Sequence, residues 1–319
     1  MEETLKEINR RSFLKRTTIL GAGILLGEGA FWNLIKETPQ LALAETVRPD
    51  IVSVKGKNYF ANTFKAVEQF GGMKGFVSRG DRVGLLVNSP FKNFGASVNP
   101  DIALAVIRMC YDAGAKEIRY LKDPYKGYWK RADLAGKYAD EIKSLKFESG
   151  DHVNMDIKDG LVLKEAKVSK DLLDCDVFIN ISKTKHHRGV HVTGTLKNMM
   201  GLCPFSTNIR FHLGSLKKLG LYGDIDHLSQ CIADLNLIRK PDLCISDATV
   251  FIVEKGPSGP GKLTSAEMVV SSLNRVSLDA FCSRLLGHQP ENILMINKAF
   301  QHGLGEINLQ KIQIKAITV

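Results

Sequence analysis

Residues 82–121 read RVGLLVNSPFKNFGASVNPDIALAVIRMCYDAGAKEIRYL, and this stretch decides the fold class. Its first seven residues are almost wholly apolar, as in a strand that is covered on both faces of its sheet. Apolar residues then recur at helical spacing over 101–113, with Asn99 as the expected N-cap and Gly114 as the stop. A second strand is expected over 116–121. Two strands joined by a crossover helix should lie parallel and adjacent.

The alternation of strands and helices continues to the end of the chain. It predicts an α/β fold with a mainly parallel sheet flanked by helices. The less regular stretches, about 120–175 and 200–225, are expected to be irregular insertions in one compound domain. The further strands are expected at 176–182, 243–253, 268–272 and, at a sheet edge, 311–317, and the further helices at 128–145, 227–239 and 278–286.

The N-terminus has the parts of a twin-arginine export signal. Arg10 and Arg11 precede an apolar run over 19–26, and Ala42-Leu43-Ala44 offers a small-x-small peptidase site. We therefore expect residues 1–44 to be a signal peptide and residues 45–319 to be a single compound α/β domain. The expected location is periplasmic or otherwise extracytoplasmic, with the twin-arginine translocase as partner during export. An uncleaved signal that anchors the chain in a membrane is the alternative.

The composition restricts the classes of partner and cofactor. A formal net charge of +10 suits anionic ligands, anionic lipid or nucleic acid. No nucleic-acid-binding motif is present, so no nucleic-acid partner is expected. The six cysteines include no Cys-x-x-Cys pair, so the sequence has no iron–sulfur motif, and we expect the thiols in apolar runs to be buried small hydrophobes.

The densest group of polar residues follows the predicted strand over 176–182, where α/β sheets bind ligands beyond the carboxyl ends of their strands. One hypothesis is a cradle for a carboxylate or phosphate, because arginine makes bidentate contacts with anions and lysine supplies point charge. The alternative without a ligand is a solvated basic loop with one or two structural histidines. The expected cradle comprises Lys183, Lys185, Arg188, Lys197 and Arg210.

A metal site is the competing hypothesis for the same segment. His186 or His187 could pair with His191, and a spacing of four would place two imidazoles on one helix face. Gly189 and the β-branched Val190 make a helix doubtful there. A His-x-x-x-His spacing without a neighbouring glutamate is also a weak motif.

Three features lie further along the chain. The loop GPSGPG over 256–261 contains Gly256 and Gly259, which can turn backbone N–H groups toward a ligand, although it is not a P-loop. Asp247 lies in or after the strand predicted over 243–253. A buried acid needs a partner, so it should meet the basic segment or help to hold a cation. Asp279 is expected to complement a helix dipole.

The ordered motifs resemble the domain of unknown function 362 family over roughly residues 82–318. Many members of that family are fused to ferredoxin-like domains, so the resemblance implies a link to redox chemistry. This chain lacks the cluster-binding cysteines, so an electron-transfer role would need a partner protein or another cofactor. The resemblance names no reaction. It rests on Asn99-Pro100, the strand from Asp176 to Lys185-His186, Thr195-Leu196-Lys197-Asn198 with Gly201, Arg210 and His212, Asp234, Asp247, Gly256-Pro257 with Gly259, and Asp279.

The leading hypothesis is an exported enzyme of unknown reaction that acts on an anionic small molecule. It leaves open whether the reaction depends on a metal or is linked to redox chemistry. The alternatives are a non-catalytic anion-binding protein and an accessory subunit of a redox partner. The sequence has no serine-hydrolase motif and no dinucleotide-binding fingerprint, so neither of those enzyme classes is supported. The expected ligand-binding residues are Lys183, Lys185, Lys197, Asn198, Arg210, Gly256 and Gly259. The expected proton-transfer residues are His186 and His212, and the ligands of a divalent metal would be His186, His191, His212 and Asp247.

Overall fold

The computed structural model describes residues 48–214 and 223–319, which form one compact unit. The expected export signal over 1–44 lies outside the described residues. Within them, no helix is both long enough and apolar enough to cross a membrane.

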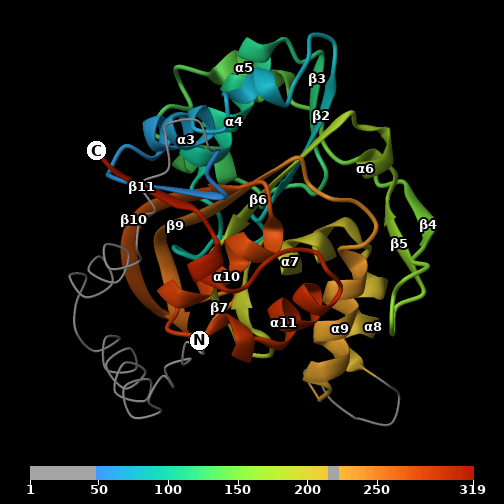
Figure 1. The fold of residues 1–319 in the computed structure, drawn as a ribbon. Coiled ribbons are helices and arrows are strands. Elements are labelled where there is room, and N and C mark those ends of the chain that lie inside the picture. Colours follow the sequence, from blue (N-terminus) through green and yellow to red (C-terminus); the bar gives the residue numbers. More distant parts are fainter. Residues whose placement is uncertain (1–47, 215–222) are drawn as a thin grey trace, which may run out of the picture. The chain divides into compact units, whose positions relative to one another are not determined.

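A seven-stranded sheet forms the centre of the molecule (Figure 1). Six strands run in one direction, and only β10 is antiparallel to both of its neighbours. The predicted α/β class is therefore confirmed. The order across the sheet is β11 (Ile314–Thr318), β1 (Ile51–Lys55), β10 (Lys262–Ser272), β9 (Leu243–Glu254), β6 (Val177–Lys183), β2 (Arg82–Val87) and β3 (Glu117–Tyr120).

The strand–helix–strand unit that the sequence predicts is confirmed. Helix α4 (Pro100–Ala113) joins β2 to β3, and these two strands pair in parallel. The Asn99 side chain accepts from the backbone N–H of Asp101, and Gly114 ends the helix with a φ of 98°. Strand β6 then pairs with β2 on the side away from β3. The chain therefore changes direction across the sheet between β2 and β6, which makes the carboxyl ends of these strands a switch point.

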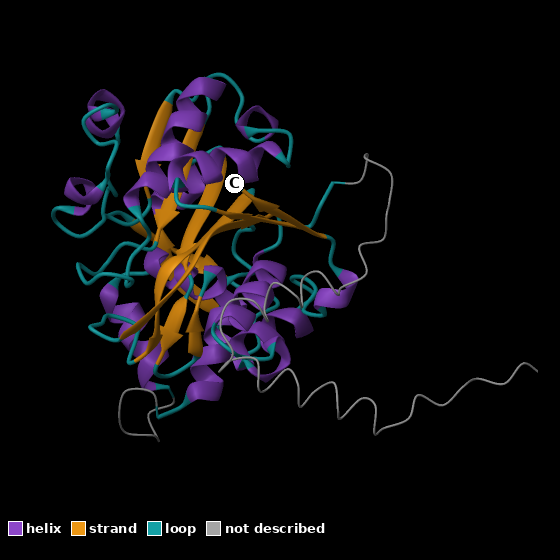
Figure 2. Cartoon of the chain, turned by 90° about the vertical axis from the view of Figure 1, so that its left-hand side faces the viewer, coloured by secondary structure: helices purple, strands orange, loops and turns teal. Residues whose placement is uncertain are grey.

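Helices cover both faces of the sheet (Figures 1 and 2). Successive residues of β2 point to opposite faces, so Leu86 belongs to one buried cluster and Leu85 and Val87 belong to the other. The helices that pack on the two faces are α3 (Tyr59–Glu68) and α4 on the side of Leu85, and α7 (Thr195–Asn198), α9 (Ile225–Leu235), α10 (Arg275–Leu285) and α11 (Leu294–Gln301) on the side of Leu86.

The prediction of one helix over 128–145 is wrong. The structure has a 3-10 turn at Tyr128–Arg131 and a separate short helix, α5 (Ala139–Ser144). Between them the backbone N–H groups of residues 133 and 134 donate to the Asp101 carboxylate at 3.1 and 3.3 Å. These N–H groups are held by a side chain of α4 instead of by carbonyls of a continuous helix.

The two expected irregular stretches contain short elements. They are the hairpin of β4 (His152–Asp156) and β5 (Glu165–Ser169), helix α6 (Lys170–Asp174) and helix α8 (Phe205–Leu213). All six cysteines are buried free thiols, which confirms the expectation for those in apolar runs. Strand β10 begins six residues before the predicted 268–272, because its first half is polar and partly exposed and lacks the apolar signal of a buried strand.

Candidate functional site

The candidate site lies at the switch point of the sheet. The segment 88–99 follows β2, and the basic segment follows β6 at the same edge. Beyond β6 the chain forms a small hairpin of β7 (Lys185–His187) and β8 (His191–Thr193). The doubt about a helix between His187 and His191 is thus confirmed, since the two residues oppose each other across the hairpin.

Lys183 and Asp247 form a buried ion pair. Lys183 Nζ lies 2.8 Å from Asp247 Oδ2, and the same oxygen accepts from the Asn99 backbone N–H at 2.6 Å. Asp247 Oδ1 accepts from both the N–H and the hydroxyl of Thr249, at 2.8 and 2.7 Å. Burial lowers the pKa of Lys183, and Asp247 opposes that shift. The expectation that Asp247 meets the basic segment is confirmed through Oδ2, while Oδ1 is held by Thr249.

Lys185 is buried without a carboxylate partner in the described structure. Its Nζ donates to Asn88 Oδ1 at 3.0 Å and to the carbonyl of Ala96, and it lies 5.0 Å from the centre of the Phe91 ring. Burial lowers its pKa well below the usual value, and the charges of Lys197 and Lys183 lower it further. The ammonium group therefore has neutral acceptors on one side and other cations nearby.

Asn198 positions Asn88, the side chain that accepts from Lys185. Its Nδ2 donates to Asn180 Oδ1 at 2.7 Å and to the Leu86 carbonyl at 3.1 Å. Its Oδ1 accepts from Asn88 Nδ2 at 2.9 Å, which orients the Asn88 oxygen toward Lys185. The structure thus gives Asn198, expected as a ligand-binding residue, a positioning role.

Lys197 is the cation of the site that has no hydrogen-bond or ion-pair partner among residues 48–214 and 223–319. It is partly buried on α7, and burial lowers its pKa to about 8. Its charge lowers the pKa of Lys185, His187 and His212, and it repels the Lys185 ammonium in particular. An anion would relieve this repulsion.

Asp279 fixes the start of α7. Its two oxygens accept from the backbone N–H groups of Thr195 and Leu196 at 2.6 and 2.9 Å. Burial raises the pKa of Asp279 to about 6, while these two backbone contacts oppose the shift. Asp279 lies in α10, so it complements the positive end of a different helix from its own.

Backbone N–H groups fix the tautomer of His187. Gly189 and Val190 donate to its Nδ1 at 3.1 and 3.2 Å. A ring nitrogen that accepts carries no proton, so the neutral ring has its proton on Nε2. Burial and the nearby Lys197 lower the pKa of His187 to about 2. His187 is therefore a neutral Nε2–H donor at any physiological pH.

The two expected proton-transfer residues have opposite tautomers. His186 accepts at Nδ1 from the Gly256 N–H at 3.1 Å, so its Nε2 carries the proton. His212 Nδ1 lies 2.7 Å from the carbonyl oxygen of Asn208, which can only accept, so its lone pair is on Nε2. Burial lowers the pKa of both rings. His212 is thus the possible base, and His186 is a donor.

The four expected metal ligands are not brought together. His191 is exposed, with its ring centre 5.7 Å from that of His288, while Asp247 is buried with both oxygens occupied. In the part of the chain that the structure describes, no three His, Cys, Asp or Glu side chains form a group that could hold a metal ion. His186 would also have to lose its Nε2 proton before that nitrogen could bind a metal.

Arg210 and the glycine loop make no hydrogen bond or ion pair with the buried lysines in the described structure. Arg210 is exposed on α8, and nothing in the described structure joins it to the lysines. Gly256 lies against the His186 backbone so closely that a Cβ atom would be 2.1 Å from the carbonyl oxygen. Gly259 has a φ of 71° and contacts Asn93, whose Nδ2 donates to the Ser258 carbonyl at 2.8 Å.

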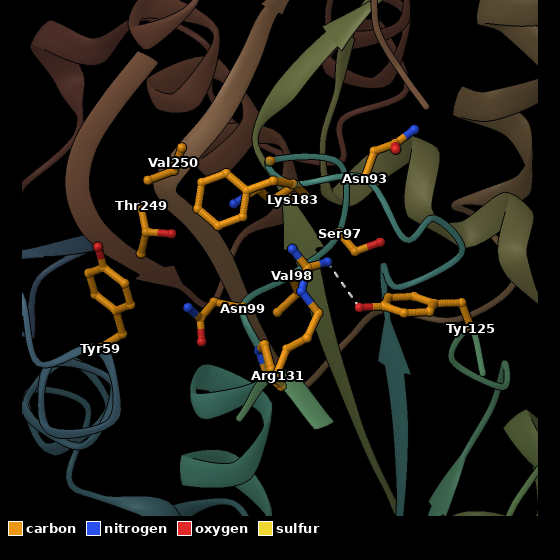
Figure 3. A pocket seen from close by; sticks show the side chains of 13 residues that line it. Tyr59, Asn93, Ser97, Val98, Asn99, Tyr125, Arg131, Lys183, Thr249 and Val250 are labelled. Carbon is orange, nitrogen blue, oxygen red and sulfur yellow. Dashed lines mark hydrogen bonds between the residues drawn. The ribbon is translucent and has the colours of Figure 1, made fainter. Parts of the chain in front are cut away.

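A pocket of about 110 Å³ lies beside Asn93 (Figure 3). Lys183 alone of the predicted site residues is among the described lining residues, and the other lining residues were not predicted. The available signal was the position of 93–100, which follows β2 at the same sheet edge as the basic segment. The lining residues are Tyr59, Asn93, Phe94, Gly95, Ser97, Val98, Asn99, Pro100, Tyr125, Arg131, Lys183, Thr249 and Val250.

Comparison with known proteins gives a family, one curated protein of similar sequence and one solved structure with a weak match. A thylakoid-associated protein of Synechocystis is 25% identical over 248 residues, which are 76% of this chain and 74% of that protein. A Thermotoga maritima protein of known crystal structure aligns with a TM-score of 0.36 and 13% identity, over 77% of this chain and 60% of its own. The model of the family described as "Domain of unknown function (DUF362)" matches residues 85–284, well over half of the chain. The expected family is therefore confirmed over residues 85–284, and the chain belongs to the DUF362 family.

Proposed function

We propose that this protein binds an anionic small molecule through Lys185 and Lys197. The observation that carries the proposal is the Lys197 ammonium, which has no counter-charge in the described structure and lies near a second buried lysine. Asp247 is committed to Lys183, so it leaves this charge uncompensated. Holding unpaired cations together in a poorly solvated place costs stability unless a ligand compensates.

The neutral groups around the lysines also suit an anion. His187 presents a fixed Nε2–H donor, and Lys185 retains one N–H beyond its contacts with Asn88 and Ala96. Charge-assisted hydrogen bonds from such donors to carboxylate or phosphate oxygens are the strong ones. The ligand class is therefore a small carboxylate or phosphate.

His212 is the group that would make the site an enzyme. Its ring lies 6.4 Å from that of His187, centre to centre, and its Nε2 lone pair is fixed by the contact of Nδ1 with Asn208. Burial lowers its pKa and so favours the neutral ring, which is the form that can accept a proton. The proposed reaction is proton transfer on the bound anion, and a binding protein without turnover is the alternative.

Isothermal titration with inorganic phosphate and with acetate tests the binding site. We expect one saturable site for at least one of these probes, and Lys197→Met to weaken it about tenfold or more, because one charge-assisted hydrogen bond is lost. Lys116→Met, which changes an exposed lysine of the same chain, is the matched control and should leave the affinity unchanged. Equal affinities of the wild type and Lys197→Met would contradict the proposal.

We also propose that the mature protein works outside the cytoplasm. The support is the order of Arg10-Arg11, the apolar run and Ala42-Leu43-Ala44. Fractionation of cells that express the full chain should find a shortened protein outside the cytoplasm. The double substitution Arg10→Lys and Arg11→Lys should retain the full-length chain inside. A full-length cytoplasmic wild type would contradict this part of the proposal.

A further inference from the structure

The pocket in Figure 3 is separate from the lysines of the proposed function. The loop 93–99 divides the two places. The carbonyl of Ala96 faces Lys185, whereas Gly95 and Ser97 on either side of it line the pocket. Neither Lys185 nor Lys197 lines the pocket, so a ligand there is recognised by other residues.

Arg131 is anchored at the pocket through Nη1, and the three N–H donors of Nε and Nη2 are left over among the described residues. Its Nη1 donates to the Lys92 carbonyl at 2.8 Å and to the Tyr125 hydroxyl at 3.0 Å. The guanidinium carbon lies 5.7 Å from the centre of the Phe94 ring. Its Nε and Nη2 have no hydrogen-bond partner in the described parts of the chain. These two atoms form the planar edge that matches the two oxygens of a carboxylate.

The rest of the pocket adds an ammonium donor and aromatic surface. Lys183 lines the pocket with a buried ammonium group, which has three N–H donors. One of them contacts Asp247. Tyr59, Phe94 and Tyr125 supply aromatic walls, and no acidic side chain is among the described lining residues. One water needs about 10–15 Å³ on the same measure, so a pocket of about 110 Å³ has room for an organic molecule.

We propose that this pocket binds a small aromatic carboxylate, with the carboxylate on the free edge of Arg131 and the ring between the aromatic walls. The fork of Arg131 selects a planar anion, and the aromatic side chains favour stacking or edge contacts with a ring. Lys183, already paired with Asp247, adds an ammonium donor to the lining. The inference does not rest on the proposed function, because it uses none of the residues that bind the anion there.

Benzoate is the probe, and benzamide is its neutral isostere. Ligand-observed NMR on the full chain should show saturable benzoate binding, with benzamide about tenfold weaker or worse because it lacks the charge. Arg131→Gln should weaken benzoate binding about tenfold or more, and Arg131→Lys should fall between it and the wild type, since charge remains and the fork is lost. Both changes are at an exposed residue, and circular dichroism checks that each variant is folded.

Lys130→Gln is the matched control, because Lys130 is the exposed neighbour of Arg131 in the same turn and does not line the pocket. It should bind benzoate like the wild type. No benzoate binding by the folded wild type, equal binding of benzamide, or an unchanged affinity in Arg131→Gln would each overturn the inference. Lys197→Met should bind benzoate normally, so this result separates a failure here from a failure of the proposed function.

Discussion

Lys183 Nζ lies 2.8 Å from Asp247 Oδ2, with 2% and 0% of the two side chains exposed. The two residues are direct partners in the parallel pairing of β6 with β9. Because Asp247 also accepts from the Asn99 backbone, the pair connects two strands to the start of α4. It therefore fixes the floor of the pocket as well as the sheet beneath it.

Removing one member of this pair should be strongly destabilising. Asp247→Asn leaves a buried ammonium without a counter-charge, and we expect a loss of about 3–5 kcal/mol in the free energy of unfolding by urea denaturation. Glu254→Gln in the exposed pair with Lys262 is the matched control and should cost less than about 1 kcal/mol. Equal losses in the two variants would show that burial does not increase the contribution of the Lys183–Asp247 pair to stability.

The pH dependence of stability should contain a contribution from Asp279. Burial raises its pKa from 3.8 to about 6 in the folded chain. The folded chain then binds this proton more tightly than the unfolded chain does, so the stabilisation is complete below pH 3.8 and is lost as the pH rises through about 6. As the pH rises between those limits, the free energy of unfolding of the wild type should fall by up to about 3 kcal/mol relative to that of Asp279→Asn. Parallel stability curves for the two proteins would contradict this assignment.

Phosphate or acetate binding should weaken in alkaline solution. Burial lowers the pKa of Lys197 to about 8, so the ammonium that would hold the anion loses its proton above that value. Titrations from pH 6 to 9.5 should show a falling affinity for the wild type above about pH 8. Lys197→Met should show a flatter profile. An identical fall in both proteins would assign the effect to another group.

The glycine loop should not accept a side chain at its first glycine. A Cβ atom on residue 256 would lie 2.1 Å from the His186 carbonyl oxygen, so Gly256→Ala should cost about 1–3 kcal/mol through overpacking. The matched control is Gly136→Ala, because a Cβ atom there has no neighbour within 4 Å and the backbone is not left-handed. Urea denaturation of both variants measures the difference. Equal stabilities would mean that the loop moves away without cost.

Local patterns made much of the fold predictable. The apolar run of β2, the helical spacing of α4 and the caps at Asn99 and Gly114 are all short-range signals, and each element was found where its pattern predicted it. The helix expected over 128–145 failed because its backbone N–H groups bind the Asp101 carboxylate, and that contact joins segments about thirty residues apart. Local propensity has no information about such a partner.

For the candidate site, the sequence determined which residues carry charge and that they follow the carboxyl ends of strands. Only the tertiary structure decided their roles. It paired Asp247 with Lys183, directed Asn198 toward Asn88, and left Lys197 without a counter-charge among the described residues. It also fixed the histidine tautomers through backbone donors and acceptors, and it brought Arg131 to a pocket formed by distant segments. The physical reason is that a hydrogen bond or an ion pair acts over a few ångströms, and those distances exist only after the chain has folded.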